Sequence, residues 1–540
     1  MATIINTLSQ NISESFQSPV LHSFQESLTV ESVIEFFKTL SWWKVFFTAL
    51  AVGLVYDQVM YQIRKGNIAG PRFKIWPVIG PFLESLDPKF EEYKAKWDSG
   101  PLSCVSIFHK FVVIASDRDL ARKIFQSPSY VKPCVVDVAI KILRPENWVF
   151  LDGKAHVDYR KGLNGLFTKQ ALAAYLPSQE EKMDHYLNHF REISKDGTAV
   201  FFHELREMMC GLSLKAFCGD YITEDQIKKV ADDYYLVTAA LELVNFPIII
   251  PFTKTWYGKR TADMTMKIFA ECAGEAKKYI RAGGKPTCVL DAWINVMEEA
   301  KKGKSDNPDA KVLVREFSNK EISEAIFTFL FASQDASSSL ACWLFQIVAD
   351  RPDIAEKIRQ EQLAVRDNDP SKPLSLELID KMTYTNMVVR ESLRYRPPVI
   401  MVPYVVKKSF QVNEGYSAPK GSMVIPTLYP ALHDPEVYEN PDEFIPERWT
   451  EGSKACEAKK NWLVFGTGPH VCLGQTYVFM TFTALLGKAI LNNDLIHKVT
   501  ELSEEIRVFA TIFPKDDLLL QFKPRDPFTP VQTKINQEVQ

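Results

Sequence analysis

The chain has 540 residues, of which 46% are hydrophobic, and a formal net charge of −3. This near-neutral balance argues against bulk attraction to nucleic acid, so any cationic surface is local. The nine cysteines are odd in number and widely spaced, and no two of them form a Cys-x-x-Cys pair. This pattern argues against a disulfide framework or a structural zinc site and is typical of a domain in a reducing compartment.

The N-terminal region predicts a membrane anchor. Residues 1–40 are polar and lack the cationic start of a cleaved signal peptide, and residues 41–63 are largely apolar. A membrane span needs about 20 such residues. Arg64 and Lys65 follow the stretch, so the positive-inside rule places the body in the cytosol and residues 1–40, with the glycosylation sequon at Asn11, in the lumen. The alternative is an amphipathic helix lying on the membrane surface.

The rest of the chain predicts a single large body. Residues 64–81 are rich in glycine and proline, and the prolines fix φ and stop helices, so this segment predicts a semi-rigid hinge. No low-complexity linker divides residues 82–523, the expected catalytic domain, and residues 524–540 form a polar tail. Helical patterns dominate, and the predicted class is mainly α with a minor β-sheet. The strand-like runs are Leu102–Ile107, Phe111–Ile114, Pro403–Val406 and Met423–Pro426.

One helical pattern is longer than the others. Ser318 and Glu321 form a capping box at its start, and the pattern stays largely apolar to about Ala349, before Arg351-Pro352 ends it. At roughly 30 residues it would be about 45 Å long. A helix that is apolar nearly all round belongs in the middle of a large core.

The segment Phe465-Gly-Thr-Gly468-Pro-His470-Val-Cys472-Leu-Gly474 predicts a tight loop that presents a thiol. A cysteine at a helix N-terminus gains from the dipole and from backbone N–H groups, which lower its pKa and favour the thiolate. A thiolate of this kind can bind haem iron. The alternative for a lone cysteine is an inert buried thiol.

This spacing resembles the haem-binding loop of the cytochrome P450 family. The resemblance implies haem b with Cys472 as the axial ligand of the iron, held in a loop that includes Phe465, Gly468, His470 and Gly474. Two further motifs match the family in order, and they supply the three residues of a structural Glu–Arg–Arg network behind the haem: Glu391, Arg394 and Arg448. A lone Glu–Arg pair three residues apart would usually be only a surface bridge.

The central helix carries Phe331-Ala-Ser-Gln-Asp-Ala-Ser-Ser338, which is similar to the oxygen-activating stretch of the family. By this resemblance Ala332 lies over the haem and Asp335 belongs to the proton relay. Ala336 stands where the family usually has a threonine, so the hydroxyl role passes to Ser337, to water or to the substrate. The alternative for Ser337 and its neighbour Ser338 is hydrogen bonding back to the helix carbonyls.

The resemblance also implies residues that contact the haem propionates and the substrate. Arg160 and His156 match the helix whose cations meet the propionates. The family more often has tryptophan at the position of His156 and arginine at the position of His470. Apolar residues expected to line a pocket for a lipid substrate are Phe327, Phe331, Val399, Met401, Ile512 and Phe513. Apolar runs of this kind more often belong to the hydrophobic core than to a ligand pocket.

Among P450 subfamilies, the segments FASQDASSS, FGTGPHVCLG and YRKGLNGLF resemble the fungal sterol C-22 desaturases of ergosterol biosynthesis. This implies formation of the C22–C23 double bond with O2 and NADPH as co-substrates, an NADPH–cytochrome P450 reductase as partner, and a single-pass enzyme of the endoplasmic reticulum membrane. A cationic face for the reductase is expected at Lys161, Arg448, Lys454, Lys459 and Lys460, with plain solvated charge as the alternative. Rival functions are a sterol 14α-demethylase, a hydroxylase, and a non-catalytic haem or sterol sensor.

Overall fold

The computed structural model describes residues 42–74, 88–107, 110–134, 137–241, 248–302, 315–509 and 511–529. Several expectations lie wholly or partly outside these residues: the segment 1–40, the sequon at Asn11, the start of the anchor at 41, the end of the hinge at 75–81, the start of the catalytic domain at 82–87 and the end of the tail at 530–540.

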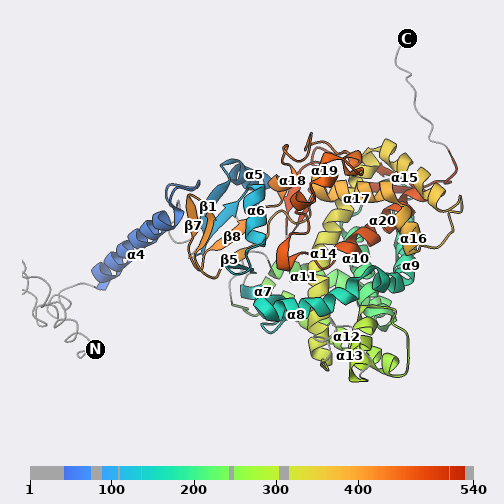
Figure 1. Cartoon of the computed structure of the whole chain (residues 1–540), viewed down its shortest axis with the longest axis horizontal. Helices are drawn as coiled ribbons and strands as arrows, with labels where there is room; N and C mark the ends of the chain where they lie inside the picture. Colours follow the sequence, from blue (N-terminus) through green and yellow to red (C-terminus); the bar gives the residue numbers. More distant parts are fainter. Residues whose placement is uncertain are drawn as a thin grey trace, which may run out of the picture.

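Helices make up most of the described chain, and the expected class is confirmed (Figure 1). The first half contains α4 (Trp42–Lys65), α5 (Phe90–Asp98), α6 (Arg118–Phe125), α7 (Asp137–Leu143), α8 (Gly153–Asn164), α9 (Lys169–Ile193), α10 (Phe202–Cys218), α11 (Glu224–Ala240) and α12 (Lys254–Arg281). The second half contains α13 (Val289–Lys301), α14 (Asn319–Asp350), α15 (Pro352–Val365), α16 (Leu376–Lys381), α17 (Thr383–Tyr395), α18 (Tyr429–Leu432), α19 (Lys454–Glu457) and α20 (Gln475–Leu491).

The four strand-like runs all belong to one sheet. Its strands are β1 (Leu102–Ile107), β2 (Lys110–Ala115), β3 (Val131–Pro133), β5 (Tyr404–Val406) and β8 (Met423–Pro426), in the order β1-β2-β8-β5-β3. The β2–β8 pair is parallel and the other pairs are antiparallel. Most of the side chains of β2 and β8 are buried. This burial explains why their sequences are nearly continuous apolar runs rather than alternating ones.

Smaller strand pairs form where no strand was expected. They are β6 (Phe410–Asn413) with β7 (Tyr416–Ala418), β4 (Ala199–Val200) and β9 (Asn493–His497) on either side of β12 (Leu519–Pro524), and β10 (Ile506–Val508) with β11 (Ile512–Pro514). Ile512 and Phe513, which were expected to line the substrate pocket, lie in β11. The β10 and β11 strands have three residues each, which is too few to show a period of two.

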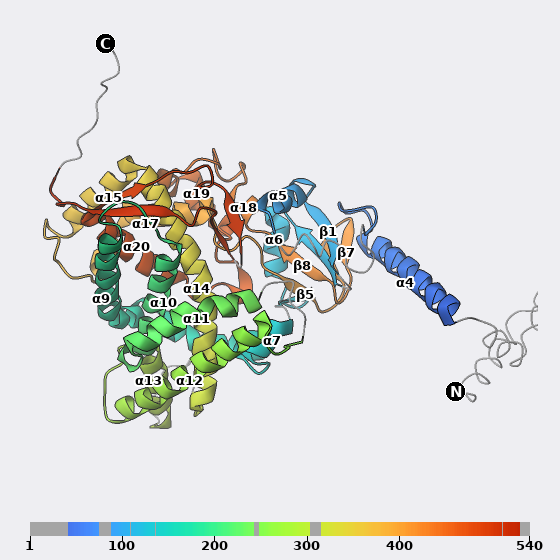
Figure 2. The ribbon, with the colours of Figure 1, turned by 180° about the vertical axis from the view of Figure 1, so that it is seen from behind.

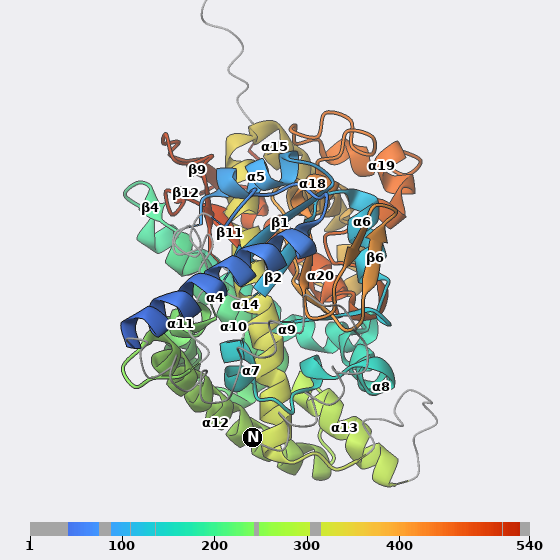
Figure 3. The same ribbon diagram turned by 90° about the vertical axis from the view of Figure 1, so that its left-hand side faces the viewer.

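Helix α14 runs through the middle of the body, as its composition predicted (Figure 3). The capping box is present, since the Ser318 hydroxyl accepts from the Glu321 N–H and the Glu321 carboxylate accepts from the Ser318 N–H. Almost every side chain from Ile322 to Val348 is buried. The helix therefore forms the central axis on which α10, α12, α17 and β11 pack.

Helix α4 projects from the side of the body that holds the five-stranded sheet (Figures 1 and 2). Among the described helices it alone is long and apolar enough to cross a membrane. Its C-terminal end is attached to the body, because Tyr61 is buried and donates to the Pro71 carbonyl at 2.7 Å. Asp57 also pairs with Lys74 at 2.6 Å. The exposed apolar part of the helix is thus its N-terminal part.

Candidate active site

The loop before α20 presents Cys472. Gly466 and Gly468 have φ values of 68° and 78°, a region that favours glycine. A Cβ on Gly468 would lie 2.6 Å from the carbonyl oxygen of Phe125, so this position also requires a close backbone approach. The Cys472 N–H donates to the Phe465 carbonyl at 2.9 Å and closes the loop. Cys472 is exposed, whereas the other eight cysteines are buried or partly buried.

The electrostatics of this thiol differ from the sequence-based expectation. Atoms of the loop crowd the sulfur, and this desolvation raises the pKa of the Cys472 thiol, although the Gly474 N–H and the Arg160 guanidinium act in the opposite direction. The N–H at the helix start thus lowers the pKa of the thiol as expected, but desolvation outweighs it and the net shift is upward. The thiolate needs a cation beside the sulfur.

The surroundings fit an iron held by a macrocycle. Within the described residues, no group of three or more His, Cys, Asp or Glu side chains could hold a metal ion. A metal at Cys472 therefore needs further ligands from a prosthetic group. Along the buried helix α14, Ala332 is exposed and Phe331, Ser333 and Ala336 are partly exposed. This interruption in the packing lies at the stretch expected to face the haem.

Polar groups that form no ion pair within the described residues gather beside the loop, and the nearby Asp152 is itself paired with Lys407. The imidazoles of His156 and His470 lie 3.9 Å apart, and Arg160 donates to the Val471 carbonyl. Trp148 stacks on His156, and its buried indole N–H has no hydrogen-bond partner. Arg160 forms no ion pair in the described structure. Burial and the neighbouring His156 lower the pKa of His470 to about 4. A group that carries carboxylates, such as haem with its propionates, fits this cluster.

The Glu391, Arg394 and Arg448 side chains are brought together and buried. Arg394 donates to both carboxylate oxygens of Glu391, at 2.8 and 3.0 Å, and Arg448 donates to one of them at 2.9 Å. The Trp449 indole and the Ile445 N–H complete the shell at 2.9 and 3.1 Å. Arg448 is therefore not available for a cationic surface, which corrects that part of the expected reductase face.

Asp335 has a partner that the sequence did not reveal. Arg206 on α10 approaches one carboxylate oxygen of Asp335 at 2.7 Å, and the Thr238 hydroxyl on α11 donates to the other at 2.9 Å. Both members of the ion pair are buried. Arg206 is 129 residues away in the chain, so no local spacing could have indicated the pair. A buried pair of this kind fixes the carboxylate.

The two serines that follow differ in their hydrogen bonding. The Ser338 hydroxyl donates to the Gln334 carbonyl at 2.6 Å, which is the expected back-bonding. Ser337 makes no hydrogen bond of this kind within the described structure, although it is buried. Its hydroxyl therefore remains available to another partner.

Residues 70–518 match the family model "Cytochrome P450". The chain is a cytochrome P450. It is 73% identical over 504 residues to the C-22 sterol desaturase ERG5 of Saccharomyces cerevisiae, an alignment that covers 93% of each chain. It is also 53% identical to the C-22 sterol desaturase erg5 of Aspergillus fumigatus, over 94% of this chain and 99% of the relative. The cytochrome P450 monooxygenase oblE of Emericella variicolor is 51% identical, over 91% of this chain and 95% of the relative.

A solved structure shares the fold of this P450. The retinoic acid-bound cyanobacterial CYP120A1 aligns with a TM-score of 0.71 at 22% identity, over 83% of this chain and 98% of that one. At this identity the likeness concerns the fold alone.

The residues expected to line the substrate pocket of the P450 fall into two groups. Phe331, Val399 and Met401 are partly exposed, whereas Phe327, Ile512 and Phe513 are fully buried. The Phe513 ring packs edge-on against Phe202 at 5.0 Å. The structure therefore does not bring all six to one accessible surface.

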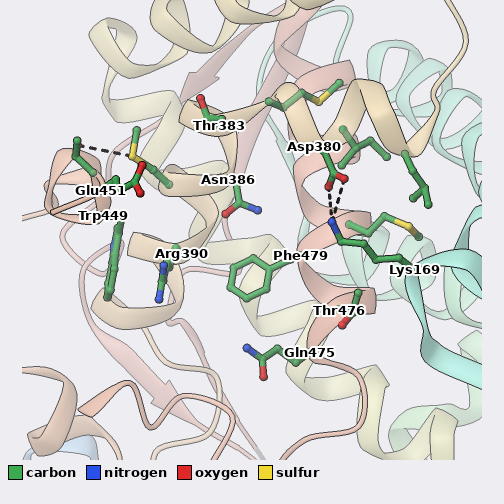
Figure 4. A pocket seen from close by; sticks show the side chains of 16 residues that line it. Lys169, Asp380, Thr383, Asn386, Arg390, Trp449, Glu451, Gln475, Thr476 and Phe479 are labelled. Carbon is green, nitrogen blue, oxygen red and sulfur yellow. Dashed lines mark hydrogen bonds and ion pairs between the residues drawn. The ribbon is translucent and has the colours of Figure 1, made fainter. Parts of the chain in front are cut away.

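A groove of about 720 Å³ lies between α16, α17 and α20 of the P450 (Figure 4). Lys169 pairs with Asp380 at one end at 2.8 Å, and Arg390 lies over the Trp449 ring at the other. Phe479 lines the groove and contacts Phe465 of the cysteine loop, with ring centroids 5.8 Å apart. One pair of aromatic rings thus connects this groove with the loop that presents the thiol.

Proposed function

We propose that the chain introduces the C22–C23 double bond into a sterol side chain in ergosterol biosynthesis. The observation that carries this proposal is the 73% identity, over 93% of both chains, to a protein named as a C-22 sterol desaturase. The reaction balances as –CH2–CH2– plus O2, NADPH and H⁺ to –CH=CH–, two waters and NADP⁺.

Haem b would supply the oxygen chemistry, and a thiolate of the protein would hold its iron as a ligand. In this proposal Cys472 is that ligand. Arg160, His156 and His470 would hold the propionates, because they lie together and form no ion pair within the described residues. The Glu391 network holds the backbone behind the site and takes no part in the chemistry.

The protons that leave with the water oxygens pass through α14. Asp335 belongs to this relay: one oxygen of its carboxylate accepts from the Thr238 hydroxyl, while Arg206 keeps the other oxygen in place. Ser337 supplies the hydroxyl that Ala336 lacks, since its hydroxyl does not bond back to the helix in the way that Ser338 does. The apolar body around α14 excludes bulk water.

We place residues 41–63 in the endoplasmic reticulum membrane, with residues 64–81 as hinge and the catalytic domain, residues 82–523, in the cytosol. The exposed apolar face of α4 supports this placement. Electrons come from an NADPH–cytochrome P450 reductase that docks on the groove side of α20. Lys454, Lys459 and Lys460, which lie shortly before the cysteine loop in the chain, contribute positive charge for an acidic partner.

Sterol turnover by the purified full chain with reductase and NADPH tests the proposal. The expected product carries a new double bond at C22–C23, identified by mass spectrometry. A hydroxylated sterol or released formic acid would instead indicate a hydroxylase or a 14α-demethylase. Absence of sterol-dependent NADPH use would favour a binding protein.

Cys472→Ala tests the ligand separately. The variant is expected to lose the thiolate-type band in the reduced carbon-monoxide difference spectrum. Cys456→Ala, a change at a partly buried cysteine outside the loop, serves as the control and should keep the band. A normal band in Cys472→Ala contradicts the assignment.

A further inference from the structure

The β10–β11 hairpin is tied to α14 at three successive helical turns. The Thr511 hydroxyl donates to the carbonyl of Asp335 at 3.2 Å. The Ser339 hydroxyl and the Trp343 indole N–H both donate to the Ile512 carbonyl, the latter at 3.1 Å. The four residues whose side chains or carbonyls make these contacts to the hairpin have buried side chains: Thr511, Ile512, Ser339 and Trp343. The hairpin is therefore held on the central helix by polar bonds as well as by packing.

These contacts fall on the helix face that carries Ala332. At 3.6 residues per turn, the side chains of Ala332, Ser339 and Trp343 point in directions within about 40° of one another. Asp335 is about 4.5 Å, and Ser339 about 10 Å, further along the axis than Ala332. The Thr511 contact at the Asp335 carbonyl thus lies about one helical turn from the exposed Ala332. Val508, which ends β10, and the following Phe509 are partly exposed.

The hairpin is also linked to the side chain of Asp335. The Arg206 guanidinium pairs with Asp335 and lies over the Phe513 ring, 5.9 Å from its centroid. The same guanidinium lies 5.5 Å from the centroid of Phe202, which packs against Phe513. Asp335 is therefore contacted through its carbonyl by Thr511 and through its carboxylate by Arg206. A shift of the hairpin would disturb both contacts.

We propose that Thr511 is a positioning residue that sets the product of the reaction. By holding the hairpin on α14 it fixes where the sterol side chain lies relative to Ala332. Desaturation removes hydrogens from two adjacent carbons, so both must stay within reach, whereas hydroxylation needs only one. Hydroxylation balances as –CH2– plus O2, NADPH and H⁺ to –CHOH–, water and NADP⁺. A loosened hairpin therefore shifts product from the alkene toward the alcohol. This inference rests on the proposed function.

The test compares Thr511→Val, Thr511→Ser and Thr500→Val in the full-length holoenzyme. Valine removes the hydroxyl at nearly constant volume, and serine restores it. Thr500 bonds to Asp516 at 2.8 Å, outside the contacts with α14, so Thr500→Val controls for general destabilisation. The readout is the ratio of 22-alkene to hydroxylated sterol, together with NADPH consumed per product and the sterol Kd from spectral titration.

Thr511→Val should lower the alkene-to-alcohol ratio by about two- to tenfold, the factor that corresponds to one neutral hydrogen bond. Thr511→Ser should restore the ratio, and Thr500→Val should leave it unchanged. A wild-type ratio in Thr511→Val, or an equal shift in Thr500→Val, overturns the inference. If Thr511→Val does not fold, Ser339→Ala removes the next anchor and is read in the same way.

A failure of the proposed function would look different. It would appear in the wild-type enzyme as a product other than the 22-alkene. The position of oxidation on that product, compared between wild type and Thr511→Val, then tests the positioning role: a shift supports it and an unchanged position overturns it.

Discussion

Replacing Glu391 by glutamine should be among the most destabilising single substitutions in this protein. The Glu391 side chain is fully buried, and its carboxylate compensates the guanidinium groups of Arg394 and Arg448, which are also buried. Glutamine keeps the shape of the side chain but removes the charge. Both cations then stay in the core without an anion, although each still donates to backbone carbonyls.

The magnitude follows from the five hydrogen bonds that the carboxylate accepts. One oxygen accepts from Arg394, Arg448 and the Ile445 N–H, and the other accepts from Arg394 and Trp449. The glutamine carbonyl can replace only one of the two carboxylate oxygens. Its NH2 group takes the place of the other oxygen and therefore faces groups that are themselves donors. Breaking a buried ion pair in this way costs about 3–5 kcal/mol. That is a large part of the roughly 5–15 kcal/mol that stabilises a native domain.

Urea unfolding of purified Glu391→Gln, monitored by circular dichroism and by haem absorbance, measures this cost. Asp380→Asn is the matched control, because Asp380 pairs with Lys169 but their side chains are 57% and 62% exposed. An exposed pair contributes about 0–1 kcal/mol. If Glu391→Gln lost less than about 1 kcal/mol, no more than the control, the buried network would not stabilise the fold as argued here.

Two further substitutions test the active-site geometry. Ser337→Ala should slow sterol turnover and raise the NADPH consumed per product. Ser338→Ala is the control and should leave coupling near the wild-type value, because the Ser338 hydroxyl bonds back to the helix at 2.6 Å. Equal coupling in both variants would remove Ser337 from the relay. Gly468→Ala should destabilise the protein by more than the roughly 1–3 kcal/mol of backbone strain alone, because its Cβ would lie 2.6 Å from the carbonyl that ends α6. Gly421→Ala, at a similar φ of 84° but with nothing within 4 Å, should show only the strain; equal losses in thermal denaturation would contradict the role of close approach.

Local patterns in the sequence determined several parts of this structure. The bounds of β1 and β8 and the capping box of α14 agree with the expectations. A cap and an apolar run depend on neighbours a few residues away, so their physical causes lie within the segment itself. The backbone turn before Cys472 is also local, because Gly466 and Gly468 adopt positive φ within the motif.

Contacts between distant segments decided the rest. Arg206 meets Asp335 from 129 residues away, and no local pattern in the sequence indicated this pair. The β10–β11 hairpin shows no strand period in three-residue strands, and it forms because α14 offers donors for its backbone. The pKa of Cys472 is raised because the folded loop removes water from the sulfur. Burial and partner choice arise only when the segments pack, and no residue spacing along the chain encodes them.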